Sequence, residues 1–128
     1  MIKAIDCVTI YSEDAKKLAD FYREKVGMKV SMEAEMGEEG EELYGFEVGK
    51  GTTFYVVDHS KVKGLNKTPE RVIINFEVDD IKKDVKKLDG AKVKKIQDIY
   101  HIENYGWVST FEDPDGNYFQ LVQVRASS

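Results

Sequence analysis

The chain contains little cysteine, proline, histidine or tryptophan: 128 residues include one Cys, two Pro, two His and one Trp. The single cysteine, Cys7, cannot form a disulfide within the chain, and no Cys/His cluster with zinc-binding spacing occurs. No stretch reaches the ~18 apolar residues that a membrane-spanning helix needs. The N-terminus reaches an acidic residue at Asp6 without an apolar run, so we do not expect a signal peptide. We therefore expect a cytoplasmic protein that does not bind membranes.

Basic charge is also in deficit, because the net charge is −5. Phosphate contacts need a basic face, so the sequence argues against a nucleic-acid partner. The acid is concentrated in one stretch, residues 33–42, which contains six glutamates: Glu33, Glu35, Glu38, Glu39, Glu41 and Glu42. Two interpretations of this stretch remain open, a solvated hairpin turn and an acidic rim that attracts a cationic ligand.

An internal repeat is present in the sequence. Residues 5–17 match residues 71–83 at a shift of 66, which places Asp14 on Asp80, and residues 51–57 match residues 116–122 at a shift of 65. The two matches occur in the same order and at nearly the same shift. They indicate that the chain is built from two related halves.

Each half predicts a strand, a helix and three further strands. We expect strands at 3–11, 28–36, 42–49 and 52–58 with a helix at 13–26, and strands at 71–79, 92–99, 105–112 and 118–125 with a helix at 80–89. Ser12 is the predicted N-cap of the first helix, Asp79 or Asp80 that of the second, and Gly27 and Gly90 follow or end them. Residues 113–117, DPDGN, predict a turn.

These elements predict an α+β fold of two βαβββ repeats that form a cupped, eight-stranded mixed sheet with the helices on its outer face. We expect one domain over residues 1–128. It comprises a first repeat at about 1–58, a linker at 59–70 and a second repeat at about 71–125.

The sequence resembles the vicinal-oxygen-chelate superfamily, which includes glyoxalase I, extradiol dioxygenases, fosfomycin-resistance enzymes and bleomycin-binding proteins. Three segments carry the resemblance: Asp20-Phe21-Tyr22 with Gly27-Met28, residues 76–81 (FEVDDI) and residues 111–117 (FEDPDGN). With the repeat, the resemblance covers nearly the whole chain. It indicates the fold better than the function, because this superfamily has many chemistries.

The resemblance implies four positions at which metal-dependent members hold their ion, typically with His and Glu. In this sequence they are Cys7, Tyr55, Ile73 and Gln120. Ile73 cannot ligate, Gln120 has no charge, and one thiolate does not make a divalent-metal site. We therefore expect no metal at these positions, no cofactor and no catalytic residue.

Aromatic and amide side chains on the predicted inner face are the stronger candidates, because ligand sites are lined by apolar groups with a few polar ones. We interpret Cys7 as an inert thiol and His59 and His101 as surface residues, and residues 100–107 as a loop at the mouth of the cup. The predicted ligand-binding residues are Cys7, Thr9, Tyr55, Ile73, Asn75, Tyr105, Trp107, Tyr118 and Gln120.

Three functions remain open. The first is a non-enzymatic small-molecule-binding protein that sequesters a cationic or aromatic compound, as the resemblance to bleomycin-binding proteins implies. The second is an enzyme of the same fold, such as a glyoxalase-like lyase, an isomerase or a dioxygenase-like enzyme acting on a small carbonyl compound; metal-dependent activity would distinguish it from the binder. The third is a regulatory or interaction module with a filled cup. The resemblance also implies a homodimer.

Overall fold

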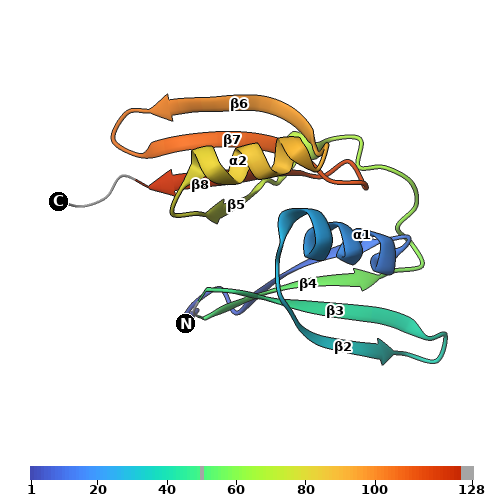
Figure 1. The fold of residues 1–128 in the computed structure, drawn as a ribbon. Helices are drawn as coiled ribbons and strands as arrows, with labels where there is room; N and C mark the ends of the chain where they lie inside the picture. The colour runs from blue at the N-terminus through green and yellow to red at the C-terminus, as the bar shows by residue number, and fades with distance from the viewer. Residues whose placement is uncertain (50, 125–128) are drawn as a thin grey trace. The chain divides into compact units, whose positions relative to one another are not determined.

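The protein was analysed as a computed structural model that describes residues 1–49 and 51–124. The chain divides into two compact units, Met1–Gly64 and Leu65–Ser128. Each unit holds one four-stranded mixed sheet with a helix on one face (Figure 1). The α+β class and the two βαβββ repeats predicted from the sequence are confirmed, and the eight strands form two separate four-stranded sheets.

The N-terminal unit has the strand order β1-β4-β3-β2. Its strands are β1 (Cys7–Ser12), β2 (Val30–Met36), β3 (Glu41–Val48) and β4 (Thr52–Asp58). The β1–β4 pair is parallel and the other two pairs are antiparallel. The helix α1 (Ala15–Phe21) continues into a π-helical turn (Tyr22–Val26), which ends at Gly27 in the left-handed conformation.

The core of this unit lies between α1 and one face of the sheet. The helix packs against β1, β3 and β4. Tyr22 and Phe54 meet edge to face with ring centroids 5.2 Å apart, and Phe46 lies next to Phe54 at 5.9 Å. Since Phe46, Phe54 and Val56 are all buried on the helix side, strand alternation places Tyr55 and Val57 on the opposite face.

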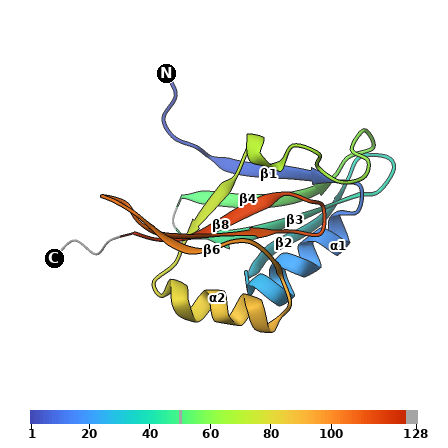
Figure 2. The ribbon, with the colours of Figure 1, turned by 90° about the horizontal axis from the view of Figure 1, so that it is seen from above.

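The C-terminal unit repeats this plan with the order β5-β8-β7-β6. Its strands are β5 (Ile74–Glu77), β6 (Lys94–Ile102), β7 (Gly106–Glu112) and β8 (Tyr118–Val124), and its helix is α2 (Ile81–Gly90). A short 3-10 turn (Pro69–Arg71) precedes β5. The helix covers one face of the sheet, as Figure 2 shows, and buries Ile81, Val85 and Leu88 against it.

The two units match residue by residue. Thr9 pairs with Tyr55 in the first unit, and Asn75 pairs with Gln120 in the second, at the shifts of 66 and 65 found in the sequence. Asp14 and Asp80, which are related by the first shift, are the N-caps of α1 and α2. The register and the caps therefore support the predicted repeat.

A second shared contact ties each helix to its sheet. The backbone N–H of Ala15, at the start of α1, donates to Asp58 Oδ1 at 2.7 Å. The backbone N–H of Ile81, at the start of α2, donates to Gln123 Oε1 at 2.9 Å. Ala15 and Ile81 are equivalent positions in the two repeats, and so are Asp58 and Gln123. The same contact therefore holds the start of α1 at the end of β4 and the start of α2 near the end of β8.

Several predicted boundaries are wrong. β1 begins at Cys7 and not at residue 3, because β4 begins at Thr52 and its pairing with β1 starts at Thr53 with Cys7. Ser12 is not the N-cap; its Oγ accepts from the N–H of Asp14, and Asp14 caps the helix. Gly90 is the last residue of α2, and Ala91 is its C-cap. The predicted end of the last strand, residue 125, lies outside the described residues.

The stretch predicted as a linker, residues 59–70, is attached at both ends. The N–H of Gly64 donates to Glu13 Oε1 at 3.0 Å in the N-terminal unit. The N–H of Asn66 donates to the carbonyl of Asp115 at 2.8 Å, within the predicted turn at 113–117. The chain therefore passes from one unit to the other between Gly64 and Leu65.

In the described part of the chain, none of the helices has the length and apolar character needed to cross a membrane.

Candidate functional site

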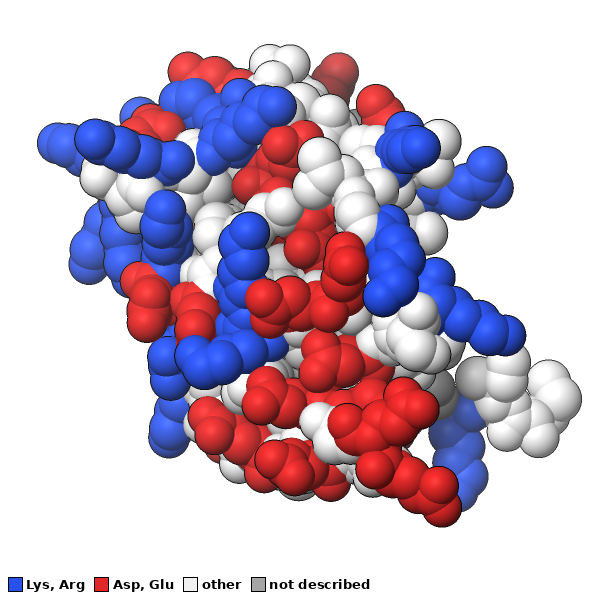
Figure 3. Space-filling model, turned by 90° about the vertical axis from the view of Figure 1, so that its right-hand side faces the viewer, with Lys and Arg blue, Asp and Glu red and all other residues white. Residues whose placement is uncertain are grey.

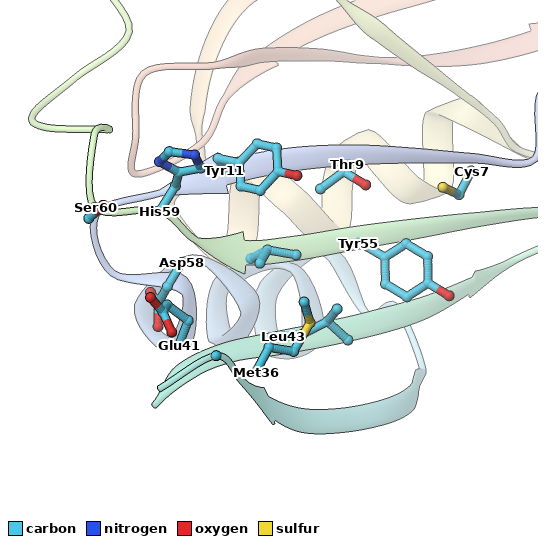
Figure 4. A pocket seen from close by; sticks show the side chains of 12 residues that line it. Cys7, Thr9, Tyr11, Met36, Glu41, Leu43, Tyr55, Asp58, His59 and Ser60 are labelled. Carbon is cyan, nitrogen blue, oxygen red and sulfur yellow. The ribbon is translucent and has the colours of Figure 1, made fainter. Parts of the chain in front are cut away.

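A cavity of about 470 Å³ lies on the face of the N-terminal sheet that α1 does not cover (Figure 4). Register explains which side chains line it. Every second residue of β1 lies on this face. These residues are Cys7, Thr9 and Tyr11, and they pair with Thr53, Tyr55 and Val57 on β4. Side chains of paired residues lie on the same face of a sheet. The full lining is Cys7, Thr9, Tyr11, Met36, Gly37, Glu41, Leu43, Tyr55, Val57, Asp58, His59 and Ser60.

The phenol ring of Tyr55 lies over Gly45 of the neighbouring strand. The two residues are paired in register, and a methyl group at Gly45 would come within 3.0 Å of Tyr55 Cε1 and 3.3 Å of Cδ1. A glycine in a strand interior lacks a side chain to pack, and an aromatic partner across the strand can cover it. The absence of a side chain at Gly45 therefore lets the Tyr55 ring lie flat on the sheet at one end of the cavity.

Tyr11 and His59 form the aromatic part of the other end. Their rings meet edge to face with centroids 5.1 Å apart. The N–H of His59 donates to the carbonyl of Ser12 at 3.0 Å, and His59 Nδ1 accepts from the N–H of Lys61 at 3.1 Å. These bonds fix the loop after β4 next to the end of β1, so His59 is held against the cavity.

Asp58, the last residue of β4, connects three elements at the edge of the cavity. Its Oδ1 accepts from Ala15 of α1, and its Oδ2 accepts from the backbone N–H of Glu42 in β3 at 2.9 Å. Both carboxylate oxygens are therefore occupied by backbone donors. Asp58 supplies negative charge near the cavity while holding α1, β3 and β4 together.

The acidic stretch at 33–42 is the β2–β3 hairpin, which confirms the hairpin interpretation. Acidic side chains gather in the lower part of Figure 3, where this hairpin lies in Figure 1. Alternation sends Glu33, Glu35 and Glu42 to the face on which α1 packs, with Tyr44. Burial, followed by the hydrogen bond that Tyr44 donates to Glu42 at 2.6 Å, raises the pKa of the Tyr44 phenol. Glu41 instead shares a face with Leu43 and lines the cavity.

Three of the predicted ligand-binding residues share the equivalent face of the C-terminal sheet. Asn75 pairs with Gln120, and Tyr118 lies two residues before Gln120 on β8. Gln120 Nε2 donates to Thr110 Oγ1 at 2.9 Å. In the N-terminal unit the positions equivalent to Thr110 and Gln120 are Gly45 and Tyr55, which form a ring-on-glycine contact in place of a hydrogen bond.

The structure does not bring Trp107 into this group. Trp107 pairs with Gln123, whose side chain bonds to the start of α2, so its indole lies on the helix-covered face, opposite Gln120. There it meets His101 with ring centroids 4.9 Å apart. The sequence predicts a loop at residues 100–107, but β6 continues to Ile102, and Asn104 takes a positive φ of 65° in a tight turn.

Two further predicted residues lie outside the strands. Tyr105 is in that turn, where its N–H donates to the carbonyl of Ile102 at 3.0 Å, and its side chain is exposed. Ile73 immediately precedes β5, which begins at Ile74. Of the nine predicted residues, the structure therefore gathers Cys7, Thr9 and Tyr55 in one cavity and Asn75, Tyr118 and Gln120 on one sheet face.

Several residues of the cavity are not among those predicted from the sequence. Tyr11 and Val57 lie two residues beyond Thr9 and Tyr55, so strand alternation could have found them. Met36, Glu41 and Leu43 depend on the register of the β2–β3 hairpin, which the sequence leaves open. Within residues 1–49 and 51–124, no three His, Cys, Asp or Glu side chains come together in a way that could hold a metal ion.

Comparisons with known proteins agree with this architecture. The family model described as "Glyoxalase/Bleomycin resistance protein/Dioxygenase superfamily" matches residues 4–121. The uncharacterized protein YetH of Bacillus subtilis (strain 168) is 31% identical over 121 residues, covering 94% of this chain and 98% of YetH.

Solved structures of low sequence identity share the fold. TnmS3, an antibiotic binding protein from Streptomyces sp. CB03234, aligns with a TM-score of 0.77 at 24% identity, over 97% of this chain and 98% of its own. The trypanothione-dependent glyoxalase I of Leishmania major aligns with a TM-score of 0.75 at 22% identity, over 95% of this chain and 87% of its own. With the matched residues 4–121, the chain belongs to the glyoxalase/bleomycin resistance protein/dioxygenase superfamily.

Proposed function

We propose that the protein binds a small organic molecule, cationic or aromatic, in the N-terminal cavity, without using a metal at Cys7, Tyr55, Ile73 and Gln120. The observation that carries this proposal is the cavity of about 470 Å³ on the face not covered by α1. Small-molecule sites are concave, roughly 300–1,000 Å³ in volume and mostly apolar. The cavity has this size and composition.

The lining suits a flat or amphipathic compound. Leu43, Val57 and Met36 supply aliphatic and thioether surface, and Tyr11 and Tyr55 supply aromatic rings. Aromatic side chains prefer offset-stacked or edge-on contact with other rings. Thr9 adds a hydroxyl that can orient a polar group on the occupant.

Relatives of the same fold support a binding role. TnmS3 is described as an antibiotic binding protein, and it covers nearly the whole of this chain. At 24% identity this likeness supports the fold, and the ligand class must come from the residues of this chain. We also propose Asn75, Tyr118 and Gln120 as contacts for a ligand on the C-terminal sheet face.

The single cysteine provides a direct test. Cys7 lines the cavity and is half-buried, so a thiol reagent modifies the chain at one defined place. We would measure the rate at which dithionitrobenzoate labels Cys7, with and without naphthalenemethanol at increasing concentration. We expect a saturable decrease in the rate, because an occupant on Thr9 and Tyr55 covers the thiol.

Two substitutions provide the control. Tyr55→Ala removes a cavity side chain and should weaken the protection, whereas Tyr105→Ala, in the exposed turn of the other unit, should leave it unchanged. Equal protection in both variants, or no protection of Cys7 by any aromatic probe, would contradict the proposed site.

A further inference from the structure

Glu41 occupies a special position at the hairpin end of the cavity. It is the first residue of β3 and pairs across the turn with Met36, the last residue of β2. Because side chains alternate along a strand, Glu41 shares its face with Leu43, and all three residues line the cavity. The side chain of Glu41 therefore places a carboxylate against aliphatic surface.

One oxygen of this carboxylate, Oε2, lacks a hydrogen-bond donor among the described residues. Among the side chains that the structure describes, Glu41 Oε2 is closed off from solvent and accepts no hydrogen bond. Gly37 creates the space that it fills, since a Cβ on Gly37 would lie 2.5 Å from Oε2. Gly37 also has a positive φ of 73°, which L side chains rarely adopt. The hairpin thus shields one side of the carboxylate from water and supplies no partner.

The surrounding groups do not compensate for this charge. No lysine or arginine belongs to the cavity lining. His59 Nδ1 is an acceptor in its bond with Lys61, and both oxygens of Asp58 are occupied by backbone N–H groups. The next residue shows the contrast: Glu42 accepts a hydrogen bond from the Tyr44 hydroxyl at 2.6 Å. A half-desolvated carboxylate without a donor is costly unless another molecule supplies one.

We propose that Glu41 is the residue that selects the ligand, and that the ligand is an amphipathic amine. Its ammonium group donates to the Glu41 carboxylate, and its apolar body lies on Leu43, Val57 and Tyr55. Charge-assisted hydrogen bonds are stronger than neutral ones, and the partly desolvated site strengthens this bond. This inference rests on the proposed function and adds the sign of the charge and the residue that recognises it.

The same geometry disfavours anions. An acid of the same shape would bring its carboxylate near Glu41 and Asp58 without a cation between them, and like charges at short range repel. The cavity should therefore rank three probes with one shared ring in the order amine, alcohol, acid.

The test uses the full, 15N-labelled chain and three matched probes: naphthylmethylamine, naphthalenemethanol and naphthoate. Binding is followed by amide chemical shifts, with the amides of β1, β4 and the β2–β3 hairpin as the site reporters. In the wild-type protein we expect the amine to bind roughly tenfold more tightly than the alcohol, and naphthoate to bind most weakly. This comparison needs no variant.

Two variants then locate the charge. Glu41→Gln keeps the shape and should bring the amine to the affinity of the alcohol, which should itself stay unchanged. Glu47→Gln is the matched control, because Glu47 lies on the same strand and face, is exposed and does not line the cavity. It should keep the preference for the amine.

The outcomes separate the two proposals. If the alcohol and the amine bind equally at the cavity, or if the preference survives in Glu41→Gln, the role of Glu41 is wrong and the binding function stands. If none of the probes shifts the cavity amides, the binding function fails and the assignment of Glu41 fails with it. If the Glu41→Gln spectrum loses its native dispersion, this variant is misfolded. The order of affinities of the three probes for the wild-type protein then tests the role of Glu41.

Discussion

Removal of the Asp58 carboxylate should destabilise the N-terminal unit by more than any single hydrogen bond would account for. Asp58 accepts from Ala15 at 2.7 Å and from Glu42 at 2.9 Å, and Ala15 is completely buried. A buried donor left without an acceptor costs about 1–3 kcal/mol. Asp58→Ala leaves two donors without an acceptor, the buried one at Ala15 and a half-buried one at Glu42, so we expect a loss of about 3 kcal/mol in the free energy of unfolding.

The equivalent contact in the C-terminal unit provides a comparison for this loss of unfolding free energy. Gln123 accepts a single bond, from Ile81, so Gln123→Ala should cost about 1 kcal/mol. The loss of unfolding free energy in Asp58→Asn should lie between these two values. The amide oxygen of Asn can still accept one of the two hydrogen bonds, but its nitrogen cannot accept the other. Asp98→Ala, at an exposed residue bonded to Ile99 and Lys95, should leave the free energy of unfolding nearly unchanged.

Urea unfolding followed by circular dichroism measures these free energies, and hydrogen exchange at the Ala15 and Glu42 amides locates the effect. Both amides should exchange faster in Asp58→Ala than in the wild-type protein. A loss under about 1 kcal/mol, with both amides still protected, would show that water replaces the carboxylate at no cost and would refute the reasoning.

Two further perturbations address the cavity and the acidic face. Gly45→Ala should push the Tyr55 ring by a few tenths of an ångström and weaken naphthalenemethanol binding several-fold. The free energy of unfolding should change by less than about 1 kcal/mol. Unchanged affinity in a chemical-shift titration would contradict the contact between the Tyr55 ring and Gly45. The raised pKa of Tyr44 contributes stability that is fully present below pH 10.0, its ordinary value, and is lost as the pH rises above it, because the unfolded chain then releases a proton that the folded chain retains. Wild-type protein should therefore lose stability relative to Tyr44→Phe between about pH 8 and about pH 11, and parallel urea curves for the two proteins would count against it.

Much of the fold followed from the sequence because local rules and the repeat agreed. The repeat aligns Asp14 with Asp80, and both cap their helices, so Asp80 is confirmed as a cap and the repeat corrects the prediction of Ser12. Alternation placed Thr9 and Tyr55 on one face, and the register pairs them. These features depend on short-range geometry, which a single sequence expresses directly.

The parts that failed depend on pairing between strands. The β1 boundary is set by where β4 begins, which no residue in 3–11 reveals. The sequence places Trp107 only at the end of a predicted loop, whereas the turn at Asn104 and the pairing with Gln123 fix its face. The cavity end at Glu41 needs the hairpin register, and one residue of slip would move every side chain of the strand to the other face.

The pair Gly45–Tyr55 and its equivalent Thr110–Gln120 allow the two repeats of one chain to be compared directly. Phe54 and Phe119 are buried in the two cores, while the opposite face of each sheet has a ring on a glycine in one unit and a hydrogen-bonded amide in the other. The two repeats thus share these core positions and differ on the sheet face that the helix does not cover. The pair Gly45–Tyr55 could therefore be exchanged for Thr110–Gln120 by mutation, so that each sheet carries the side chains of the other at this place.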